Sequence, residues 1–291
     1  MRKDRADSIE RITLRPMTFQ DIPLGMRLKE AAGWNQLEAD WEMLLRASSR
    51  GCFVAAYDGV DAGTVTTVTY QRRFSWIGMA LVDPAYRRRG IGTALLKAAI
   101  RAVQDIGPVR LDATPLGRKL YDLLGFKEEY RLLRMGCRPN ALTLPSSPAC
   151  HQVTEDVFPA LVRLDASVFG AEREMILRSL LRRAPQFAFL AKSGEEIVGY
   201  CLGRPGSRFD QIGPVVAEGE EAARALLLAA LSHIGSKGVI LDVPLYQQGW
   251  IAFLRDLGFT EQRPFVRMYL GGSGPFGRPE WQFAIAGPEI G

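Results

Sequence analysis

The sequence predicts an α+β fold, an α/β mixed sheet, that is built twice in tandem. Strand-like segments dominate and helices are inserted singly between them, short motifs recur at a nearly constant offset, and a proline-rich segment separates the two copies. The 291 residues suffice for two domains that each bury a core. With 47% hydrophobic and 24% charged residues, the composition excludes a disordered or collagen-like chain.

The first copy is predicted as a series of strands with single helices between them. Residues 11–15 alternate polar and apolar side chains like a strand, and Asp21 can cap a helix that runs toward Ala32. Asp58-Gly59 is typical of a tight hairpin turn. The apolar spacing over 91–103 predicts an amphipathic helix. The other predicted elements are strands over 53–57, 62–70, 74–82, 109–113 and 130–136 and a short helix over 117–124.

Recurring motifs indicate the second copy. Their offsets lie between 130 and 135 residues, which is too regular for chance. The pairs are Leu111-Asp112 with Leu241-Asp242, Leu124-Gly125-Phe126 with Leu257-Gly258-Phe259, Arg134-Met135 with Arg267-Met268, and Ile77-Gly78 with Ile212-Gly213. We therefore expect a first domain over 1–138, a linker over 139–150 and a second domain over 151–291. In the tail of the second domain, residues 281–285 alternate like a strand that packs back on a sheet.

Charge is unequal between the copies. Residues 1–144 carry 23 Lys and Arg against 16 Asp and Glu, whereas the remainder carries 14 against 16. The basic excess is concentrated in one short run, which favours a small phosphorylated ligand over nucleic acid. No apolar run is long enough to cross a membrane and the first residues lack a signal peptide, so we expect a cytoplasmic protein with no membrane partner. The four cysteines and two histidines are not spaced for a metal site or a disulfide framework.

The segment from Leu81 to Leu96 carries the strongest signal. A strand ends, Asp83-Pro84 turns the chain, and an arginine-rich loop with Gly90 opens directly into a helix. Unpaired amides at the start of a helix, the positive end of its dipole and nearby guanidinium groups all suit a phosphate. The alternative is a solvated basic turn with ordinary glycine caps. The segment has neither the Gly-x-Gly-x-x-Gly fingerprint of dinucleotide sites nor a Walker A sequence.

Two motifs carry a resemblance to a known family. Arg87-x-x-Gly90-x-Gly92 after the strand resembles motif A of the GNAT superfamily of N-acetyltransferases, and the run from Leu120-Tyr121 to Gly125-Phe126 resembles that family's closing helix and turn. Because of the repeat, the whole chain resembles a tandem-GNAT bacterial acetyltransferase whose second GNAT domain is degenerate. The resemblance implies two domains, each with a central, mostly antiparallel twisted sheet flanked by helices.

The resemblance also implies roles for single residues. Backbone groups of Leu81 and Val82 would bind the pantetheine arm of acetyl-CoA as if it were an added strand. Tyr121 would protonate the departing thiolate, or it is an ordinary packing residue. The strand before motif A has no carboxylate, so Asp112 on the next strand is the candidate general base; otherwise it caps the following turn or binds the substrate amine. The residues expected to cradle the pyrophosphate are Arg87, Arg88, Arg89, Gly90, Ile91, Gly92 and Thr93.

The second copy has lost the features that suit a phosphate. Its counterpart of motif A is shorter, and Glu218, Glu220 and Glu221 stand where the first copy has arginines. Carboxylates there would oppose a pyrophosphate, so this copy should not bind CoA. Its Asp242 and Tyr246 either face a cationic substrate or belong to a domain that only packs against the first.

These observations predict an acetyl-CoA-dependent N-acetyltransferase with no metal, which acts on a primary amine of a small molecule by direct attack in a ternary complex. No cysteine lies in the motif, which disfavours a covalent acyl-enzyme. The alternative is a non-catalytic acyl-CoA-binding regulatory or sensor protein. We expect a monomer or a homodimer with no nucleic-acid partner.

Overall fold

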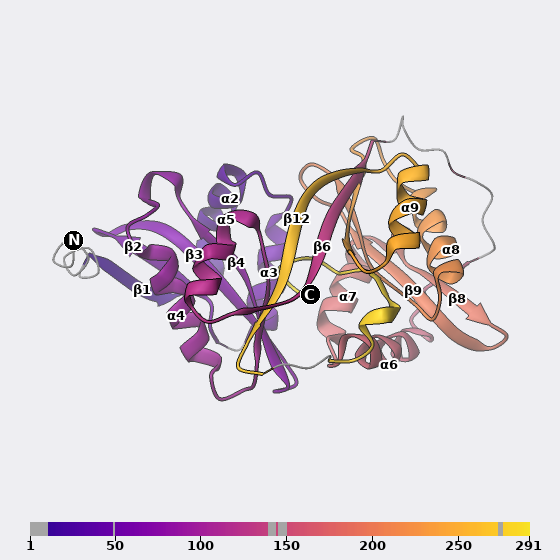
Figure 1. Ribbon diagram of the computed structural model, residues 1–291, viewed down its shortest axis with the longest axis horizontal. Coiled ribbons are helices and arrows are strands. Elements are labelled where there is room, and N and C mark those ends of the chain that lie inside the picture. Colours follow the sequence, from indigo (N-terminus) through magenta and orange to yellow (C-terminus); the bar gives the residue numbers. More distant parts are fainter. Residues whose placement is uncertain (1–10, 49, 139–143, 145–149, 273–275) are drawn as a thin grey trace. The chain divides into compact units, whose positions relative to one another are not determined.

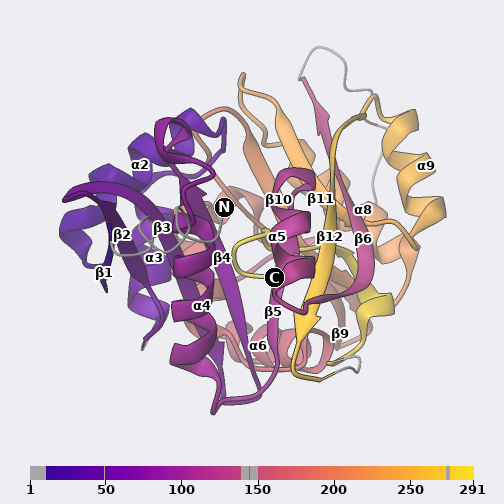
Figure 2. The same cartoon turned by 60° about the vertical axis from the view of Figure 1, so that its left-hand side comes forward.

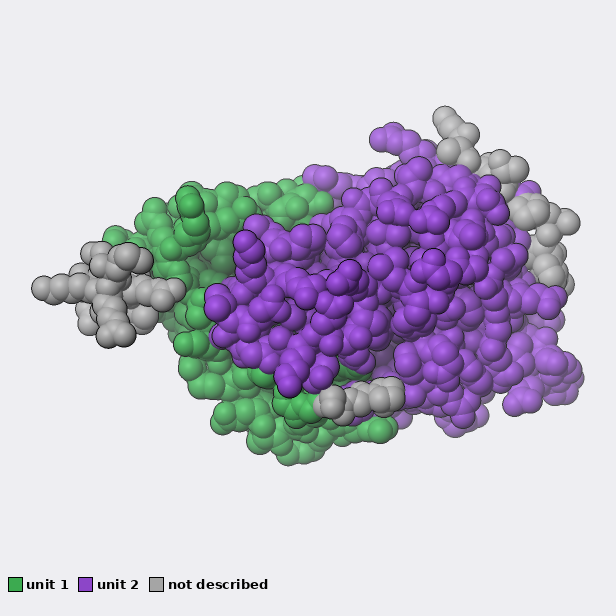
Figure 3. Space-filling model, viewed as in Figure 1, with its two compact units in different colours: residues 1–111, 270–272, 290 green, residues 112–269, 273–289, 291 purple. Residues whose placement is uncertain are grey.

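The computed structural model describes residues 11–48, 50–138, 144, 150–272 and 276–291. Most of the predicted linker over 139–150 therefore lies outside the described residues. The chain divides into two compact units, coloured separately in Figure 3. Unit 1 comprises residues 1–111, 270–272 and 290, and unit 2 comprises residues 112–269, 273–289 and 291. Each unit is a mixed α/β layer structure with a mostly antiparallel sheet.

Unit 1 contains strands in the order β1-β2-β3-β4-β5. Neighbouring strands are antiparallel except β4 and β5, which are parallel. Helix α4 packs on one face of this sheet, and α2 with α3 covers the other (Figure 1). The bounds are β1 Ile12–Pro16, α2 Ile22–Ala31, α3 Glu38–Ala47, β2 Phe53–Tyr57, β3 Val60–Tyr70, β4 Phe74–Val82, α4 Ile91–Val103 and β5 Val109–Ala113.

Unit 2 contains strands in the order β12-β6-β11-β10-β9-β8-β7, and β13 pairs with β10. Helices α6 and α7 cover one face, and α8 and α9 cover the other (Figure 1). The bounds are α5 Pro115–Leu123, β6 Lys127–Cys137, β7 His151–Gln152, α6 Phe158–Phe169, α7 Glu174–Arg183, β8 Phe189–Ser193, β9 Glu196–Arg204, β10 Asp210–Ala217, α8 Glu220–Leu231, β11 Val239–Pro244, α9 Gln248–Asp256, β12 Thr260–Leu270 and β13 Gln282–Ala284.

The last strand of the first sequence copy, β6, belongs to unit 2. It lies between β11 and β12 and is antiparallel to both. Figure 2 shows β6 beside β12. The compact units therefore part after Leu111 and not at the predicted linker, because β6 forms its hydrogen-bond ladders with strands of the second copy. The domains over 1–138 and 151–291 are defined by the sequence repeat and stay a prediction. The two compact units are defined by packing and need not have the same bounds.

Many predicted elements have the bounds that the sequence indicated. The strand over 74–82, the helix over 91–103 and the strand over 109–113 are β4, α4 and β5. The tail strand predicted over 281–285 is confirmed as β13. Helix α3 was not predicted as a separate element. Among the described residues, no helix is long and apolar enough to span a bilayer.

Candidate functional site

Strand β4 contains a bulge at Met79, which has a φ of 47°. Gly78 pairs with Thr66 of β3 but Leu81 pairs with Thr64, so the register shifts between them. The hydroxyl of Thr64 donates a 3.0 Å hydrogen bond to the carbonyl of Met79 and holds the bulge. A bulge of this kind bends a strand and redirects its backbone groups.

Beyond this bulge β4 has left the ladder that it forms with β5. The parallel ladder consists of Ser75 with Val109 and Trp76 with Arg110, both at the start of β4. The strands part after these pairs, so residues 77–82 of β4 run beyond the ladder. Among the described residues no strand pairs with residues 77–82 on that side, so an extended ligand could add there as a further strand.

The chain then turns and enters α4. Gly90 occupies the N-cap with a φ of 90°, a conformation that glycine adopts most readily, and no side chain caps this helix. The amides of Ile91, Gly92 and Thr93 precede the first residue with an intrahelical acceptor, since Ala94 donates to Gly90. The start of α4 therefore presents N–H donors and the positive end of its dipole.

Three exposed arginines surround this helix start. Arg87 Nε donates to the carbonyl of Val82 at 3.3 Å. The guanidinium of Arg89 lies 5.0 Å from the ring centre of Tyr57 and 5.4 Å from that of Tyr86. Arg88 has a φ of 62°. The three side chains supply positive charge, which suits an anionic ligand.

Tyr121 belongs to unit 2, on helix α5. A Cβ at Gly117 would lie 2.8 Å from a carbon of the Tyr121 ring, so the glycine leaves room for the ring. Phe126 packs against the same ring with centroids 5.8 Å apart. Burial raises the pKa of Tyr121 to about 12. The phenol therefore keeps its proton at neutral pH, as a proton donor must.

Asp112, the candidate base, forms a buried ion pair. Its two carboxylate oxygens accept from Nε and Nη2 of Arg267 at 2.8 and 2.9 Å, and its side chain is 0% exposed. Burial acts to lower the pKa of Arg267, but Asp112 and Tyr130 outweigh it and hold that pKa above its usual value. Arg267 also donates to the hydroxyl of Tyr130 at 2.5 Å. These bonds anchor Asp112 and do not leave it poised to accept a proton.

Asp242, the counterpart of Asp112 in the repeat, is held in the same way. Its carboxylate accepts from Nε and Nη2 of Arg134 at 2.7 and 2.6 Å, and Gln211 adds a third bond at 3.0 Å. Each aspartate is thus bound by the arginine of the other sequence copy. All four residues of these ion pairs lie in the repeated Leu-Asp and Arg-Met motifs. The spacing of the motifs alone does not indicate which aspartate pairs with which arginine. One of the two expectations for Asp242 was contact with a cationic substrate. The structure instead places the guanidinium of Arg134 against this carboxylate.

Tyr246 also has a structural partner. Its hydroxyl donates to the carbonyl of Pro279 at 2.7 Å, and its ring lies edge-on to Tyr130 with centroids 5.3 Å apart. These contacts attach the tail of the chain to β6 within unit 2. They favour the packing role for this tyrosine.

In the second copy the equivalent opening is filled by β13. Strands β10 and β11 share two ladder pairs, at Asp210 and Gln211, and then part. Strand β13 pairs with β10 at Val215 and Val216. The amide of Ile285 then donates to the carbonyl of Asp242 on β11 at 3.0 Å. The tail therefore makes the backbone bonds that β4 leaves available in the first copy.

The helix that follows β10 is acidic at its start. Glu220 and Glu221 lie in the first turn of α8, where they complement the helix dipole. Glu220 forms an ion pair with Arg224 on the same helix. No glycine-spaced arginine loop precedes this helix, so both the charge and the opening differ from the first copy.

Comparisons with known proteins identify the family. A model described as the acetyltransferase (GNAT) family matches residues 12–126, and a model described as an acetyltransferase (GNAT) domain matches residues 161–284. The chain belongs to the GNAT family. It contains two GNAT domains in tandem, as the motifs predicted.

Relatives and solved structures agree along nearly the whole chain. The holothin acyltransferase of Pseudoalteromonas sp. (strain SANK 73390) is 25% identical over 96% of this chain and 94% of that protein. A Pyrococcus horikoshii protein assigned as an acetyltransferase has a TM-score of 0.81 at 23% identity, covering 97% of this chain and 96% of its own. A tandem GNAT protein from the clavulanic acid biosynthesis pathway has a TM-score of 0.63 at 14% identity, covering 91% and 100%. The two structures share the fold, and an acyltransferase is the activity class that the family indicates.

Proposed function

We propose that this GNAT protein is an acetyl-CoA-dependent N-acetyltransferase, and that unit 1 binds the acyl-CoA. The observation that carries the proposal is the order of three structural features between β4 and the start of α4. The open side of β4 leads through a basic loop to the bare N-terminus of α4. A long, thin ligand with an amide-containing arm and a pyrophosphate matches that order. The arm would bond to Leu81 and Val82, and the pyrophosphate would meet the amides from Arg87 to Thr93.

The reaction that follows is direct attack of an amine on the thioester in a ternary complex. Backbone amides of β4 near the Met79 bulge would stabilise the oxyanion that develops on the carbonyl. Tyr121 would give its proton to the leaving thiolate, a role supported by its place in the motif. The pKa of about 12 that burial gives it keeps the phenol protonated at neutral pH. The relative named as a holothin acyltransferase supports group transfer as the activity.

Asp112 fits the role of general base poorly, because both of its oxygens accept from Arg267. We infer that the acceptor is an amine that reaches the thioester in its neutral form and that its nitrogen loses a proton to solvent as the C–N bond forms and the C–S bond breaks. Asp112 then anchors the end of β5. An aspartate held in this way also agrees with the alternative function, in which the chain binds acyl-CoA as a sensor without transfer. Release of free thiol in the presence of a small primary amine would separate the two functions.

The first test is calorimetric titration with acetyl-CoA. One site per chain is expected, and replacing Arg88 and Arg89 together by Ala should weaken binding about tenfold or more, since contacts to charged groups are the stronger hydrogen bonds. Lys97 and Arg101 are exposed on α4 itself, so replacing both by Ala removes the same charge away from the loop. An equal loss in both double variants would contradict the assignment to the loop. Absence of binding to the unaltered protein would overturn the acetyl-CoA proposal.

A further inference from the structure

The turn that leads into the arginine loop is tied to helix α2. Arg27 of α2 forms an ion pair with the carboxylate of Asp83, and its Nη2 donates to the carbonyl of Asp61 at 3.1 Å. The side chain of Asp83 is 17% exposed and that of Arg27 is 52% exposed. Arg27 therefore connects α2, the start of β3 and the first residue after β4, all within unit 1.

Asp83 organises the short 3-10 turn of residues 84–86. Its other carboxylate oxygen accepts from the amide of Ala85 at 3.0 Å, and its carbonyl accepts from the amide of Tyr86 at 2.9 Å. Partial burial acts to raise the pKa of Asp83, but the bonds from Ala85 and Arg27 outweigh it and hold that pKa below its usual value. The carboxylate therefore remains ionised at neutral pH and needs a positive partner.

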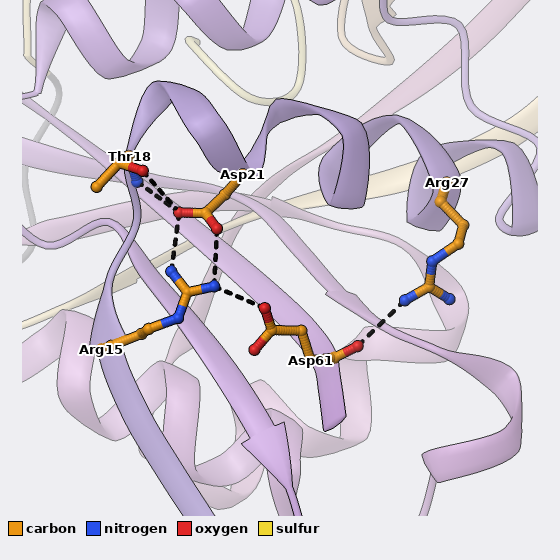
Figure 4. Close-up of polar contacts among 5 residues, drawn as sticks. All are labelled: Arg15, Thr18, Asp21, Arg27 and Asp61. Atoms are coloured by element: carbon orange, nitrogen blue, oxygen red, sulfur yellow. Dashed lines mark hydrogen bonds and ion pairs between the residues drawn. The ribbon is translucent and has the colours of Figure 1, made fainter. Parts of the chain in front are cut away.

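Arg27 is itself supported by a second arginine (Figure 4). Arg15 of β1 donates to both oxygens of Asp21, at 2.9 and 2.7 Å, and to the carboxylate of Asp61 at 2.6 Å. The amide of Thr18 adds a 2.8 Å bond to Asp21. Asp61 is thus held through its side chain by Arg15 and through its carbonyl by Arg27. The network fixes the frame in which Arg27 reaches Asp83.

Asp83 is also the only acidic residue between Leu81 and Thr93. A free carboxylate at this place would repel the anionic ligand that the arginines and the helix start attract. Arg27 offsets that charge and at the same time orients the side chain that caps the turn. Neither effect requires Arg27 to touch the ligand.

We propose that Arg27 is a positioning residue for acyl-CoA binding, which acts through Asp83 on the turn that carries the arginine loop. The inference rests on the proposed function of this loop. Arg27→Ala should weaken acetyl-CoA binding about fivefold, the size typical of a partly exposed ion pair, and should raise KM with little change in kcat. Arg27→Lys keeps the charge and should restore most of the affinity.

A double-mutant cycle tests whether Arg27 acts through Asp83. Asp83→Asn removes the negative charge while its side-chain oxygen can still accept from Ala85. In that background Arg27→Ala should change the Kd for acetyl-CoA less than twofold. The matched control is Arg50→Ala, which breaks the exposed ion pair of Arg50 with Asp105 elsewhere in unit 1 and should leave the Kd unchanged.

Hydrogen exchange of the Ala85 amide gives a readout that needs no ligand. It should speed up in Arg27→Ala and recover in Arg27→Lys, because the acceptor Asp83 loses its anchor. Unchanged exchange, or a loss of affinity no larger than in Arg50→Ala, would overturn the positioning role. If the unaltered protein does not bind acetyl-CoA, the proposed function fails, whereas the exchange result still decides whether Arg27 holds the turn.

Discussion

The opening beside β4 and the opening beside β10 are built on the same scaffold but have opposite contents. In each copy the parallel ladder has two pairs, and in each a bulge follows in the antiparallel ladder on the other side. In the first copy the chain continues into a basic loop and an uncapped helix. In the second, β13 pairs with the strand and two glutamates begin the helix. The difference teaches that one backbone geometry can lead either to an open strand edge with a basic loop or to an edge that the chain's own tail fills, with an acidic helix start.

What the copies share is the ion pair that joins them. Asp112 with Arg267 and Asp242 with Arg134 are equivalent pairs, both inside unit 2. A buried charge that loses its partner is costly, so we expect each of these four residues to stabilise unit 2. The two copies therefore agree in these buried pairs and differ at the start of the helix that follows β4 or β10.

The largest effect is expected from breaking one of these pairs. Arg134→Ala leaves Asp242 buried, with a side chain that is 0% exposed, and should lower the free energy of unfolding by about 3–5 kcal/mol. Denaturation in urea, followed by tryptophan fluorescence, measures the loss, and Trp250 and Trp281 of unit 2 contribute to that signal. Arg255→Ala, which breaks the exposed pair with Glu261, is the control and should cost less than about 1 kcal/mol. A loss of unfolding free energy in Arg134→Ala no larger than that in Arg255→Ala would show that the buried pair is dispensable.

These pairs also mark the limit of prediction from the sequence. Local patterns sufficed for β4, α4 and β5, because hydrophobic spacing and the glycine-spaced loop are written in consecutive residues. The partner of Asp112 lies 155 residues away, and no local pattern indicates which strand pairs with which. The position of Asp112 on the strand therefore suggested a base, whereas its actual partner, Arg267, lies on β12 of the other sequence copy.

The filling of the second opening can be tested at Ile285, which follows β13. Its side chain is fully buried and packs with Leu132 and Phe265. Ile285→Ala should cost about 2–4 kcal/mol of unfolding free energy through the cavity it leaves. The affinity for acetyl-CoA should stay within twofold, as measured by calorimetry at a temperature where the variant is folded. A loss of affinity without a loss of stability would place the tail in the binding of ligand and undermine the contrast between the copies.

A smaller effect, on rate alone, is expected at Tyr121. The equivalent position in the second copy is Leu254, which is fully buried, so only the first copy retains a phenol there. Tyr121→Phe should lower kcat about 10- to 100-fold with an unchanged Kd for acetyl-CoA. Tyr246→Phe, which removes a hydroxyl bonded to Pro279, is the control and should leave kcat unchanged.

The pH dependence of the rate sharpens the test of Tyr121. A proton donor is active below its pKa, and burial raises that of Tyr121 to about 12, so its contribution is present at neutral pH and is lost only as the pH approaches 12. Ionisation of Tyr121 should therefore not lower the rate between about pH 8 and 10. In that range the pH profiles of the unaltered protein and of Tyr121→Phe should have the same shape. A descending limb in that range that vanishes in the variant would mean that the phenol ionises far below this value.

The smallest effect is expected from reversing the charge at the start of α8. This change tests whether the glutamates or the tail strand β13 keeps acetyl-CoA out of the opening beside β10. Replacing Glu220 and Glu221 by Arg gives the start of α8 the sign of charge found before α4. Acetyl-CoA should still bind at one site per chain, because β13 holds the backbone of Val215 and Val216. The cost to stability should be about 1–2 kcal/mol, since two carboxylates that complement the helix dipole are lost. Calorimetric stoichiometry decides the point: a second site would show that the glutamates alone keep the ligand out, whereas one site shows that the tail strand suffices.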